Sequence, residues 1–210
     1  MATEVEARFG ASGPEPLASL ATVPRLGPAE LGPAAASSET DVYLDTADGA
    51  LAAARWACRL RTRGERITLS LKGPPEGAGG GWLHRRPEAE GAATEQRDPA
   101  AWPPSPAREL LEHLSGGSPL VERFVLHQQR VERSVTHGAH RIGTLSLDTV
   151  DVEHAAARVG RLHVVELELS AGTEDEAVLE PLAAALGAVP GLTPAPRTKL
   201  ERALALIAGG

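Results

Sequence analysis

Pairs of like-charged residues recur at a spacing of two in this sequence. Glu4 and Glu6 form one carboxylate pair, Glu166 and Glu168 form another, and Arg59-Leu60-Arg61 is a basic pair. On a β-strand, residues two apart point to the same face, with Cα atoms about 6.5–7 Å from one another. Carboxylates at that spacing repel unless a cation lies between them, and guanidinium groups repel unless an anion does.

One kind of site relieves both repulsions. Carboxylate oxygens are the ligands that Mg²⁺ and Mn²⁺ prefer, and Asp148 adds a fifth carboxylate in a similar setting. Guanidinium groups match phosphate oxygens as two-pronged donors. A divalent metal ion together with a polyphosphate therefore satisfies both clusters. The alternative is a set of exposed strand faces with surface ion pairs, which stabilise a fold very little. Only the recurrence of the pattern on several strands favours the site.

Strands must position these residues, because alternation of polar and apolar side chains dominates the sequence. Eight strands are predicted, at residues 3–9, 42–46, 56–63, 66–72, 82–90, 120–135, 141–150 and 162–169. Helical spacing appears near residues 17–21, 107–114, 175–186 and 197–207. The rest of 14–40 and the stretch 91–106 are rich in Pro, Gly and Ala, and are expected to be connections. The fold class is therefore α+β.

Length and composition limit the classes of function that this chain can have. The 210 residues suit one domain spanning 1–210, and the net charge of −7 argues against binding to nucleic acid through the overall field. Cys58 is the only cysteine, so no internal disulfide is available. The N-terminus resembles no leader, and no run of 18 apolar residues predicts a membrane span. We expect a soluble, cytoplasmic protein without a membrane partner, and no pattern indicates an oligomeric state.

Short motifs follow one another in a characteristic order. They are Glu4-Val5-Glu6-Ala7-Arg8, Tyr43-Leu44-Asp45-Thr46, Arg59-Leu60-Arg61, Leu71-Lys72-Gly73-Pro74, Arg86-Pro87-Glu88-Ala89-Glu90, Arg130, Leu147-Asp148, Glu166-Leu167-Glu168 and Thr198-Lys199-Leu200. In order and spacing the sequence resembles the CYTH superfamily, also called triphosphate tunnel metalloenzymes, over essentially the whole chain. The signature of that family is Glu-x-Glu-x-Lys near the N-terminus.

The resemblance implies an eight-stranded antiparallel β-barrel with flanking helices, whose interior is a tunnel for triphosphate. It implies Mg²⁺ or Mn²⁺ as cofactor, with Glu4, Glu6, Asp148, Glu166 and Glu168 as metal ligands. The implied phosphate-binding residues are Arg8, Arg59, Arg61, Lys72, Arg86, Arg130 and Lys199. Glu4, Glu6, Arg59 and Lys72 are the implied catalytic residues. Glu88 and Glu90 are expected to brace the basic residues or to help bind a second metal ion.

Two positions depart from the family pattern. Arg8 replaces the lysine of the signature with a broader donor group, and Gln129 stands where many relatives have a lysine. Strand alternation predicts that Gln129 points away from the tunnel. Its effect on phosphate binding is then expected to be small.

The expected function is hydrolysis of inorganic triphosphate or of an organic triphosphate such as thiamine triphosphate, and the expected partner is a triphosphate or polyphosphate small molecule. A non-catalytic polyphosphate-binding module is the main alternative. An adenylyl cyclase is a weaker one, because one Tyr, two Phe and three Trp offer few stacking partners for adenine. Loops 74–81 and 91–106 are expected to select any organic group.

Overall fold

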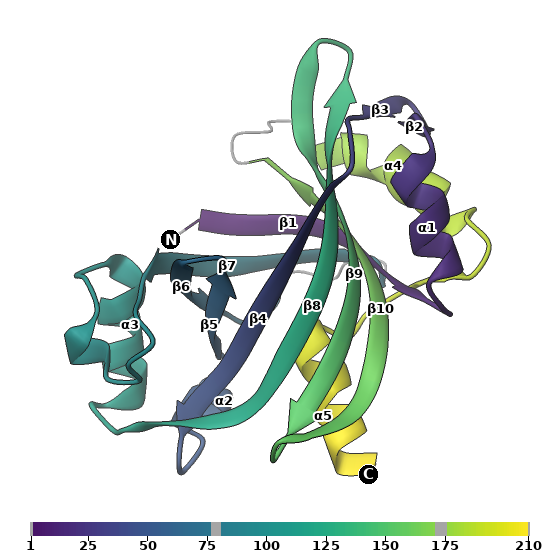
Figure 1. The fold of residues 1–210 in the computed structure, drawn as a ribbon. Helices are drawn as coiled ribbons and strands as arrows, with labels where there is room; N and C mark the ends of the chain where they lie inside the picture. The colour runs from purple at the N-terminus through teal and green to yellow at the C-terminus, as the bar shows by residue number, and fades with distance from the viewer. Residues whose placement is uncertain (1, 77–80, 171–175, 210) are drawn as a thin grey trace.

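Eight antiparallel strands close into a barrel in the computed structural model, which describes residues 2–76, 81–170 and 176–209 (Figure 1). Around the barrel the order is β4 (Ala35–Thr46), β5 (Ala57–Arg63), β6 (Arg66–Lys72), β7 (Leu83–Ala92), β1 (Ala2–Ala11), β10 (Ala157–Leu169), β9 (His140–His154) and β8 (Leu120–His137). β8 pairs with both β9 and β4, which closes the ring. The predicted α+β fold with an eight-stranded barrel is confirmed.

Short elements complete the chain. The sheet is extended by β3 (Ala29–Leu31), which pairs with β8, by β2 (Arg25–Leu26), which pairs with β3, and by β11 (Leu192–Pro194), which pairs with β1. The helices are α1 (Glu15–Thr22), α2 (Ala50–Ala53), α3 (Pro106–Ser115), α4 (Leu179–Gly187) and α5 (Lys199–Gly209), with 3-10 turns η1 (Pro99–Ala101) and η2 (Glu176–Val178). Part of the predicted loop 74–81 and the start of the predicted helix 175–186 fall outside the described residues.

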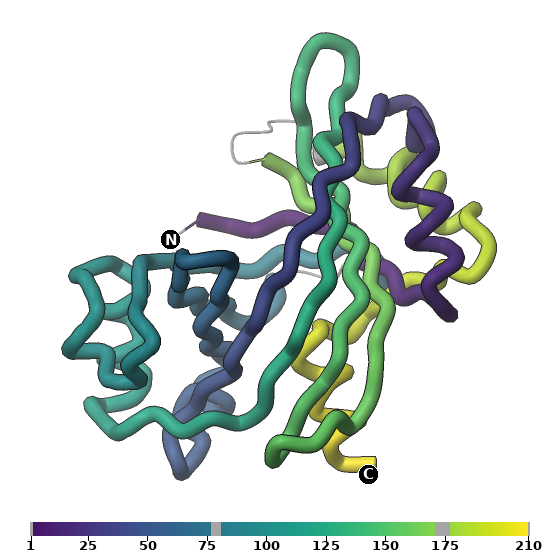
Figure 2. Tube along the Cα trace, in the orientation of Figure 1, coloured from purple at the N-terminus to yellow at the C-terminus, as the bar shows by residue number. Residues whose placement is uncertain are grey.

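Two apolar layers cover the outside of the barrel. Around β1, β9 and β10, side chains such as Phe9, Leu145 and Leu167 pack with α1 and α4. Beside β5 and β6, Cys58 and Leu69 pack with α2 and α3. These residues alternate with the charged ones, so the strands present an apolar face to the helices and a charged face to the barrel interior. Figure 2 shows α1 and α4 together on one side of the trace and α3 on the other.

A third apolar cluster lies inside the barrel and seats the C-terminal helix. Ala203 of α5 packs with Phe124 of β8, Val150 of β9 and Val164 of β10, all of them buried. Val150 and Val164 share the inner face with Asp148 and Glu166, two residues away along their strands. In Figure 1, α5 accordingly lies against the lower ends of β8, β9 and β10. This packing holds the first turn of α5 against the charged part of the interior.

The prediction for residues 14–46 was partly wrong. The short helix is present as α1, but β4 begins at Ala35 and not at Val42, and β2 and β3 lie in the stretch expected to be a mobile connection. β4 pairs with β8 along its whole length, from Ala35 opposite Glu132 to Thr46 opposite Leu120. This tertiary pairing supplies the hydrogen bonds that the Ala- and Ser-rich local sequence does not signal.

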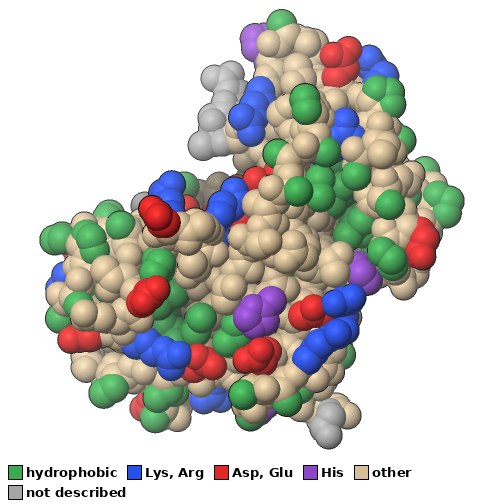
Figure 3. Space-filling view, viewed as in Figure 1, with side chains coloured by type: hydrophobic (Ala, Val, Ile, Leu, Met, Phe, Trp, Pro, Cys, Tyr) green, Lys and Arg blue, Asp and Glu red, His purple; other side chains and the backbone are tan. Residues whose placement is uncertain are grey.

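The surface carries charges of both signs. On the face shown in Figure 3, Lys and Arg side chains are interspersed with Asp and Glu, and hydrophobic side chains are scattered between them. Within the described part of the chain, none of the helices has the length and apolar character needed to cross a membrane.

Candidate active site

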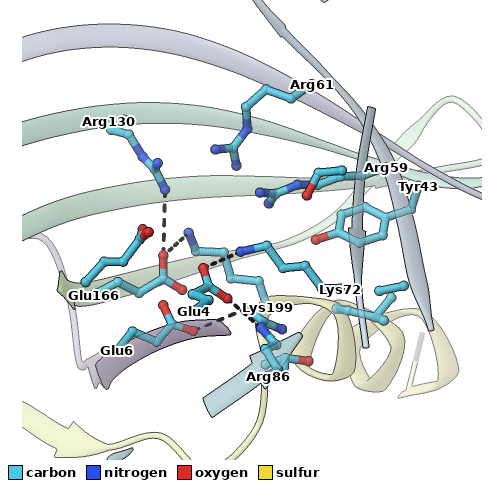
Figure 4. Close-up of a pocket in the computed structure, with 15 residues that line it drawn as sticks. Glu4, Glu6, Tyr43, Arg59, Arg61, Lys72, Arg86, Arg130, Glu166 and Lys199 are labelled. Atoms are coloured by element: carbon cyan, nitrogen blue, oxygen red, sulfur yellow. Dashed lines mark hydrogen bonds and ion pairs between the residues drawn. The ribbon is translucent and has the colours of Figure 1, made fainter. Parts of the chain in front are cut away.

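Charged side chains from the strands and from the first turn of α5 converge on a pocket inside the barrel (Figure 4). The pocket is lined by Glu4, Glu6, Tyr43, Ala57, Arg59, Arg61, Ser70, Lys72, Arg86, Arg130, Glu166, Glu168, Thr198, Lys199 and Leu200. Most of the residues predicted for the site are in this group. The inner faces inferred from two-residue alternation therefore do meet in space.

Strand register places opposite charges next to each other in this pocket. Glu4 of β1 lies opposite Arg86 of β7, and Arg8 of β1 lies opposite Glu166 of β10. Antiparallel partners share a face of the sheet, so their side chains come within reach of one another. The interior is thus built from strands that carry acidic and basic side chains side by side.

The signature carboxylates near the N-terminus are both engaged by cations. Glu4 forms an ion pair with Lys72 and accepts a hydrogen bond from Arg86 Nε at 2.7 Å. Burial alone would raise the pKa of Glu4, but Lys72 and Arg86 lower it to about 2. Glu6 forms ion pairs with Arg8 and, at 3.2 Å, with Arg86. Both carboxylates are buried.

A second ionic network joins β8, β9, β10 and α5. Lys199 Nζ donates to Asp148 Oδ2 at 2.6 Å and to Glu166 Oε2 at 2.7 Å. Arg130 donates to both oxygens of Asp148 at 2.7 Å. Burial would raise the pKa of Asp148 and of Glu166, but these cations hold both below their usual range. Lys199 therefore ties α5 to the charged lining.

Asp41, which the sequence patterns did not reveal, organises the basic pair. Its side chain is fully buried and accepts hydrogen bonds from Arg59 Nη1 at 3.1 Å, from Arg61 Nε at 2.7 Å and Nη2 at 2.8 Å, and from Gln128 Nε2 at 2.8 Å. Burial opposes its charge, yet Arg59 and Arg61 keep the pKa of Asp41 well below the usual range. Asp41 was missed because the predicted strand began only at Val42. Its two-residue spacing from Tyr43 was the available signal.

Glu39 is a second missed carboxylate on the inner face of β4. It is 3% exposed and forms ion pairs with Arg61 at 3.2 Å and with Arg63. Arg130 lies 3.8 Å from the same carboxylate. The basic residues on this side of the barrel are therefore also held by acids.

Glu168 differs from the other carboxylates. Its side chain is exposed at the edge of the pocket and forms no hydrogen bond or ion pair with any residue the structure describes. Restricted hydration by the surrounding protein, followed by the charge of Glu4 and that of Glu6, raises the pKa of Glu168 to about 7. The charges of Glu4 and Glu6 therefore repel that of Glu168, and negative charge is concentrated around these three carboxylates.

Other predicted residues take different places. Arg8 and Asp148 are almost completely buried behind the pocket lining, where they pair with residues that face the pocket. Glu88 accepts from Ser70 at 3.0 Å and lies 3.1 Å from Lys72, so it does brace a basic residue. Gln129 is exposed on the outside of β8, as alternation predicted.

The donor set suits a hard divalent cation, although the carboxylates do not form a ready-made shell. Nowhere in the described ranges do three Asp, Glu, His or Cys side chains meet in a metal-binding arrangement. Glu4 and Glu6 instead pair with Lys72, Arg8 and Arg86. The negative charge shared with Glu168 is the place where an oxygen-preferring ion would be stabilised.

The family assignment rests on a match that extends along nearly the whole chain. A family model described as the CYTH domain matches residues 2–204. The chain belongs to the CYTH family. Among proteins with curated descriptions, none matches this CYTH domain in sequence.

Solved structures share the fold of this CYTH domain. The candidate adenylyl cyclase HpAC1 from Hippeastrum, described as having a dominant triphosphatase activity, has a TM-score of 0.65 at 19% identity, covering 98% of this chain and 96% of its own. A candidate adenylate cyclase from Bacillus halodurans has a TM-score of 0.61 at 19% identity, with 96% and 98% covered. The Mimivirus capping enzyme triphosphatase has a TM-score of 0.52 at 12% identity, with 90% and 88% covered. At these identities the likeness concerns the fold alone.

Proposed function

We propose that this CYTH domain is a hydrolase of triphosphate compounds that requires Mg²⁺ or Mn²⁺. The observation that carries the proposal is the convergence of six basic side chains on one pocket inside the barrel from four strands and a helix. They are Arg59, Arg61, Lys72, Arg86, Arg130 and Lys199. Guanidinium and ammonium donors around a cavity match the oxygens of a compact polyanion better than they match a neutral substrate.

The charge balance of the site supports a metal ion as a second component. Arg8 behind the lining and Arg63 beside Glu39 bring the cations to eight, and the four lining carboxylates become eight with Glu39, Asp41, Glu88 and Asp148. The interior is therefore close to neutral before any ligand enters. A triphosphate brings about four to five negative charges at neutral pH, since the second ionisation of a phosphate lies near pH 6. Divalent cations that enter with it would restore the balance.

Residues Glu4, Glu6 and Glu168 would hold the ion, with Asp148 and Glu166 as the remaining acidic candidates. When bound, the ion would supply positive charge beside the phosphate oxygens. In hydrolysis a water oxygen attacks the terminal phosphorus, the bond to the bridging oxygen breaks, and the remaining diphosphate leaves, which is pyrophosphate when the substrate is inorganic triphosphate. The proton of the water passes to the released phosphate or to solvent. The basic residues of the chain bind the phosphates in line and stabilise the charge that collects on the leaving group.

Two other activities are distinguished by their products. A binding module would bind triphosphate without turnover, and an adenylyl cyclase would convert ATP into cyclic AMP and pyrophosphate. We expect phosphate release from inorganic tripolyphosphate to require Mg²⁺ or Mn²⁺. Glu4→Gln and Arg59→Ala should each reduce that release at least about a hundredfold.

The matched controls are exposed residues of the same types, Glu65→Gln and Arg66→Ala, which lie at the β5–β6 turn. Both should retain activity. Binding of tripolyphosphate, thiamine triphosphate or ATP without phosphate release from any of the three would exclude the hydrolase in favour of the binding module. Cyclic AMP as the main product from ATP would favour the cyclase.

A further inference from the structure

Two arginines beside α5 carry buried donors that have no acceptor. Arg8 of β1 is 1% exposed; its Nη2 pairs with Glu6, and its Nε lies 3.4 Å from Glu166. Nη1 of Arg8 and Nη1 of Arg202, a residue of α5, are both shielded from solvent and have no hydrogen-bond partner in the described part of the chain. A buried donor without an acceptor is costly, above all when it carries charge.

The two guanidinium groups also lie close enough to repel each other. Burial, followed by the positive charge of Arg8, lowers the pKa of Arg202, and the charge of Glu166 opposes this only in part. Gly10 follows Arg8 on the inner face of β1, and a Cβ at position 10 would lie 3.4 Å from Nη1 of Arg202. The head of Arg202 therefore lies against β1, next along the strand from Arg8. An anion between two such groups relieves their repulsion.

This pair of arginines lies outside the lining of the polar pocket. Glu6 and Glu166, which do line the pocket, contact Arg8 from the pocket side. Lys199, one turn before Arg202 on α5, is held by Glu166 and by a second carboxylate. A triphosphate bound by the six basic lining residues therefore leaves the Nη1 donors of Arg8 and Arg202 free.

The chemistry of the two donors selects a phosphate group. Guanidinium groups bind phosphate oxygens through paired hydrogen bonds, and two arginines match the charge of a dianion. A cation would add to the repulsion, and a neutral ligand would leave it in place. Arg202 is only partly buried, so its long side chain can move off Gly10 and admit the group beside α5.

We propose that Arg8 and Arg202 form a second anion site, which binds one phosphate group in addition to those held in the polar pocket. The group is free inorganic phosphate or the fourth phosphate of a longer inorganic polyphosphate, and its chemistry at the site is the same in both cases. This inference rests on the proposed function only in that a triphosphate fills the polar pocket. It requires no hydrolysis.

Calorimetry in the presence of Mg²⁺ tests the site without turnover. The protein is first saturated with a non-hydrolysable imido analogue of tripolyphosphate, and inorganic phosphate is then titrated in. We expect one further phosphate to bind per protein. Arg202→Gln, which removes the charge and keeps a polar side chain, should weaken that binding at least about tenfold and change the affinity for the analogue less than about twofold.

A second comparison addresses the longer chain. Tetrapolyphosphate and tripolyphosphate are compared by kcat/KM, or by calorimetric affinity if neither is hydrolysed. If the fourth phosphate is the ligand, the intact protein should favour tetrapolyphosphate at least about tenfold, and Arg202→Gln should lose this preference.

Arg197→Gln is the matched control, because Arg197 is an exposed arginine five residues before Arg202 and its loss changes the net charge equally. It should leave all the values unchanged. In phosphate-free buffer, Arg202→Gln should melt at or above the temperature of the intact protein, since it removes a charge that Arg8 repels. A clearly lower melting temperature would overturn the repulsion on which the site rests.

The outcomes separate the two sources of phosphate and the two proposals. Additional phosphate binding that is lost in Arg202→Gln identifies free phosphate, and a preference for tetrapolyphosphate that is lost in the same variant identifies the longer chain. Phosphate that only competes with the analogue, or still binds in Arg202→Gln, together with equal values for the two polyphosphates, would overturn the second site. Absence of hydrolysis alone would overturn the hydrolase and leave the anion site standing.

Discussion

Arg130 on β8 and Asp148 on β9 are register partners whose side chains form a two-pronged ion pair inside the barrel, with Nε–Oδ1 and Nη2–Oδ2 both at 2.7 Å. Lys199 adds a third donor to the same carboxylate at 2.6 Å. Asp148 is fully buried, so water cannot take the place of its carboxylate beside the two cations. The stability of the barrel therefore depends on this buried ion pair between β8 and β9.

Asp148→Asn should lower the free energy of unfolding by about 3–5 kcal/mol, because it leaves buried cations without their partner. Urea denaturation measures the change. The matched control is Asp151→Asn, three residues along β9, whose partly exposed carboxylate makes the same two-pronged pair with Arg161 at 2.7 and 2.8 Å. Water can solvate Arg161 once this exposed pair is lost, so no measurable change in the free energy of unfolding is expected. Equal effects of the two substitutions would contradict the role given to burial.

Arg133 holds the segment before β4 against the barrel. This buried guanidinium donates to the carbonyl oxygens of Leu20, Val23, Leu31 and Gly32 at 2.6–3.0 Å. Arg133→Leu should cost about 3 kcal/mol of unfolding free energy, since several buried carbonyls lose their donor. The same denaturation experiment on Arg141→Leu, an exposed residue of β9, should show little change. An Arg133→Leu variant as stable as the intact protein would show that the four hydrogen bonds are dispensable.

Without divalent metal ions, the stability of the protein is expected to depend on pH through Glu168. Its pKa is raised to about 7 by restricted hydration and by Glu4 and Glu6, against about 4.5 for an ordinary glutamate. Between these values the folded protein binds the proton and the unfolded chain does not, so this group lowers stability as pH rises through that window. Glu168→Gln should therefore be more stable than the intact protein at about pH 8 and equal to it at about pH 4. Thermal melting at both pH values measures this.

Glu180→Gln is the control for that experiment, because Glu180 is an exposed carboxylate on α4, outside the barrel. It should leave the difference between the acidic and the alkaline measurement unchanged. A Glu168→Gln variant with the same pH profile as the intact protein would contradict the crowding of negative charge at Glu4, Glu6 and Glu168.

Asp41 is expected to act as a positioning residue for the basic pair. Asp41→Asn removes the charge that orients Arg59 and Arg61, and should raise KM for tripolyphosphate about tenfold with a smaller change in kcat. Steady-state kinetics measure both values. Ser38→Ala, an exposed neighbour on β4 that donates to Gln129 on the outside, should leave both unchanged. A loss confined to stability, with KM intact, would reduce Asp41 to a structural role.

Much of the candidate site could be predicted because alternation is a local property. Spacing alone shows that Glu4 and Glu6 share a strand face, and that Arg59 and Arg61 do too. The motifs give the order of the strands along the chain. Asp41 and Glu39 could not be found in that way, since the strand that presents them is stabilised by pairing with β8, a distant segment of the chain. The partners within the site were equally hidden, because the pairing of Lys199 with Asp148 depends on where α5 docks.

A more apolar pocket next to the charged one, sharing Tyr43, Lys72 and Leu200 with it, was also beyond the sequence. Leu204, Trp56 and Phe124 lie in three separate segments, and each has an ordinary explanation as a core residue. Only the packing of α5 inside the barrel brings them around one space. Local patterns predict which face a side chain takes, whereas the depth at which a helix docks depends on the whole set of interior side chains.

The most direct test of the central claim is a crystal structure with Mn²⁺ and a non-hydrolysable imido analogue of tripolyphosphate. The anomalous signal of manganese locates the ion independently of the phosphates. We predict manganese bound by Glu4, Glu6 and Glu168, with the analogue held by Arg59, Arg61 and Lys72 inside the barrel. An analogue bound outside the barrel, or manganese remote from these carboxylates, would contradict the account.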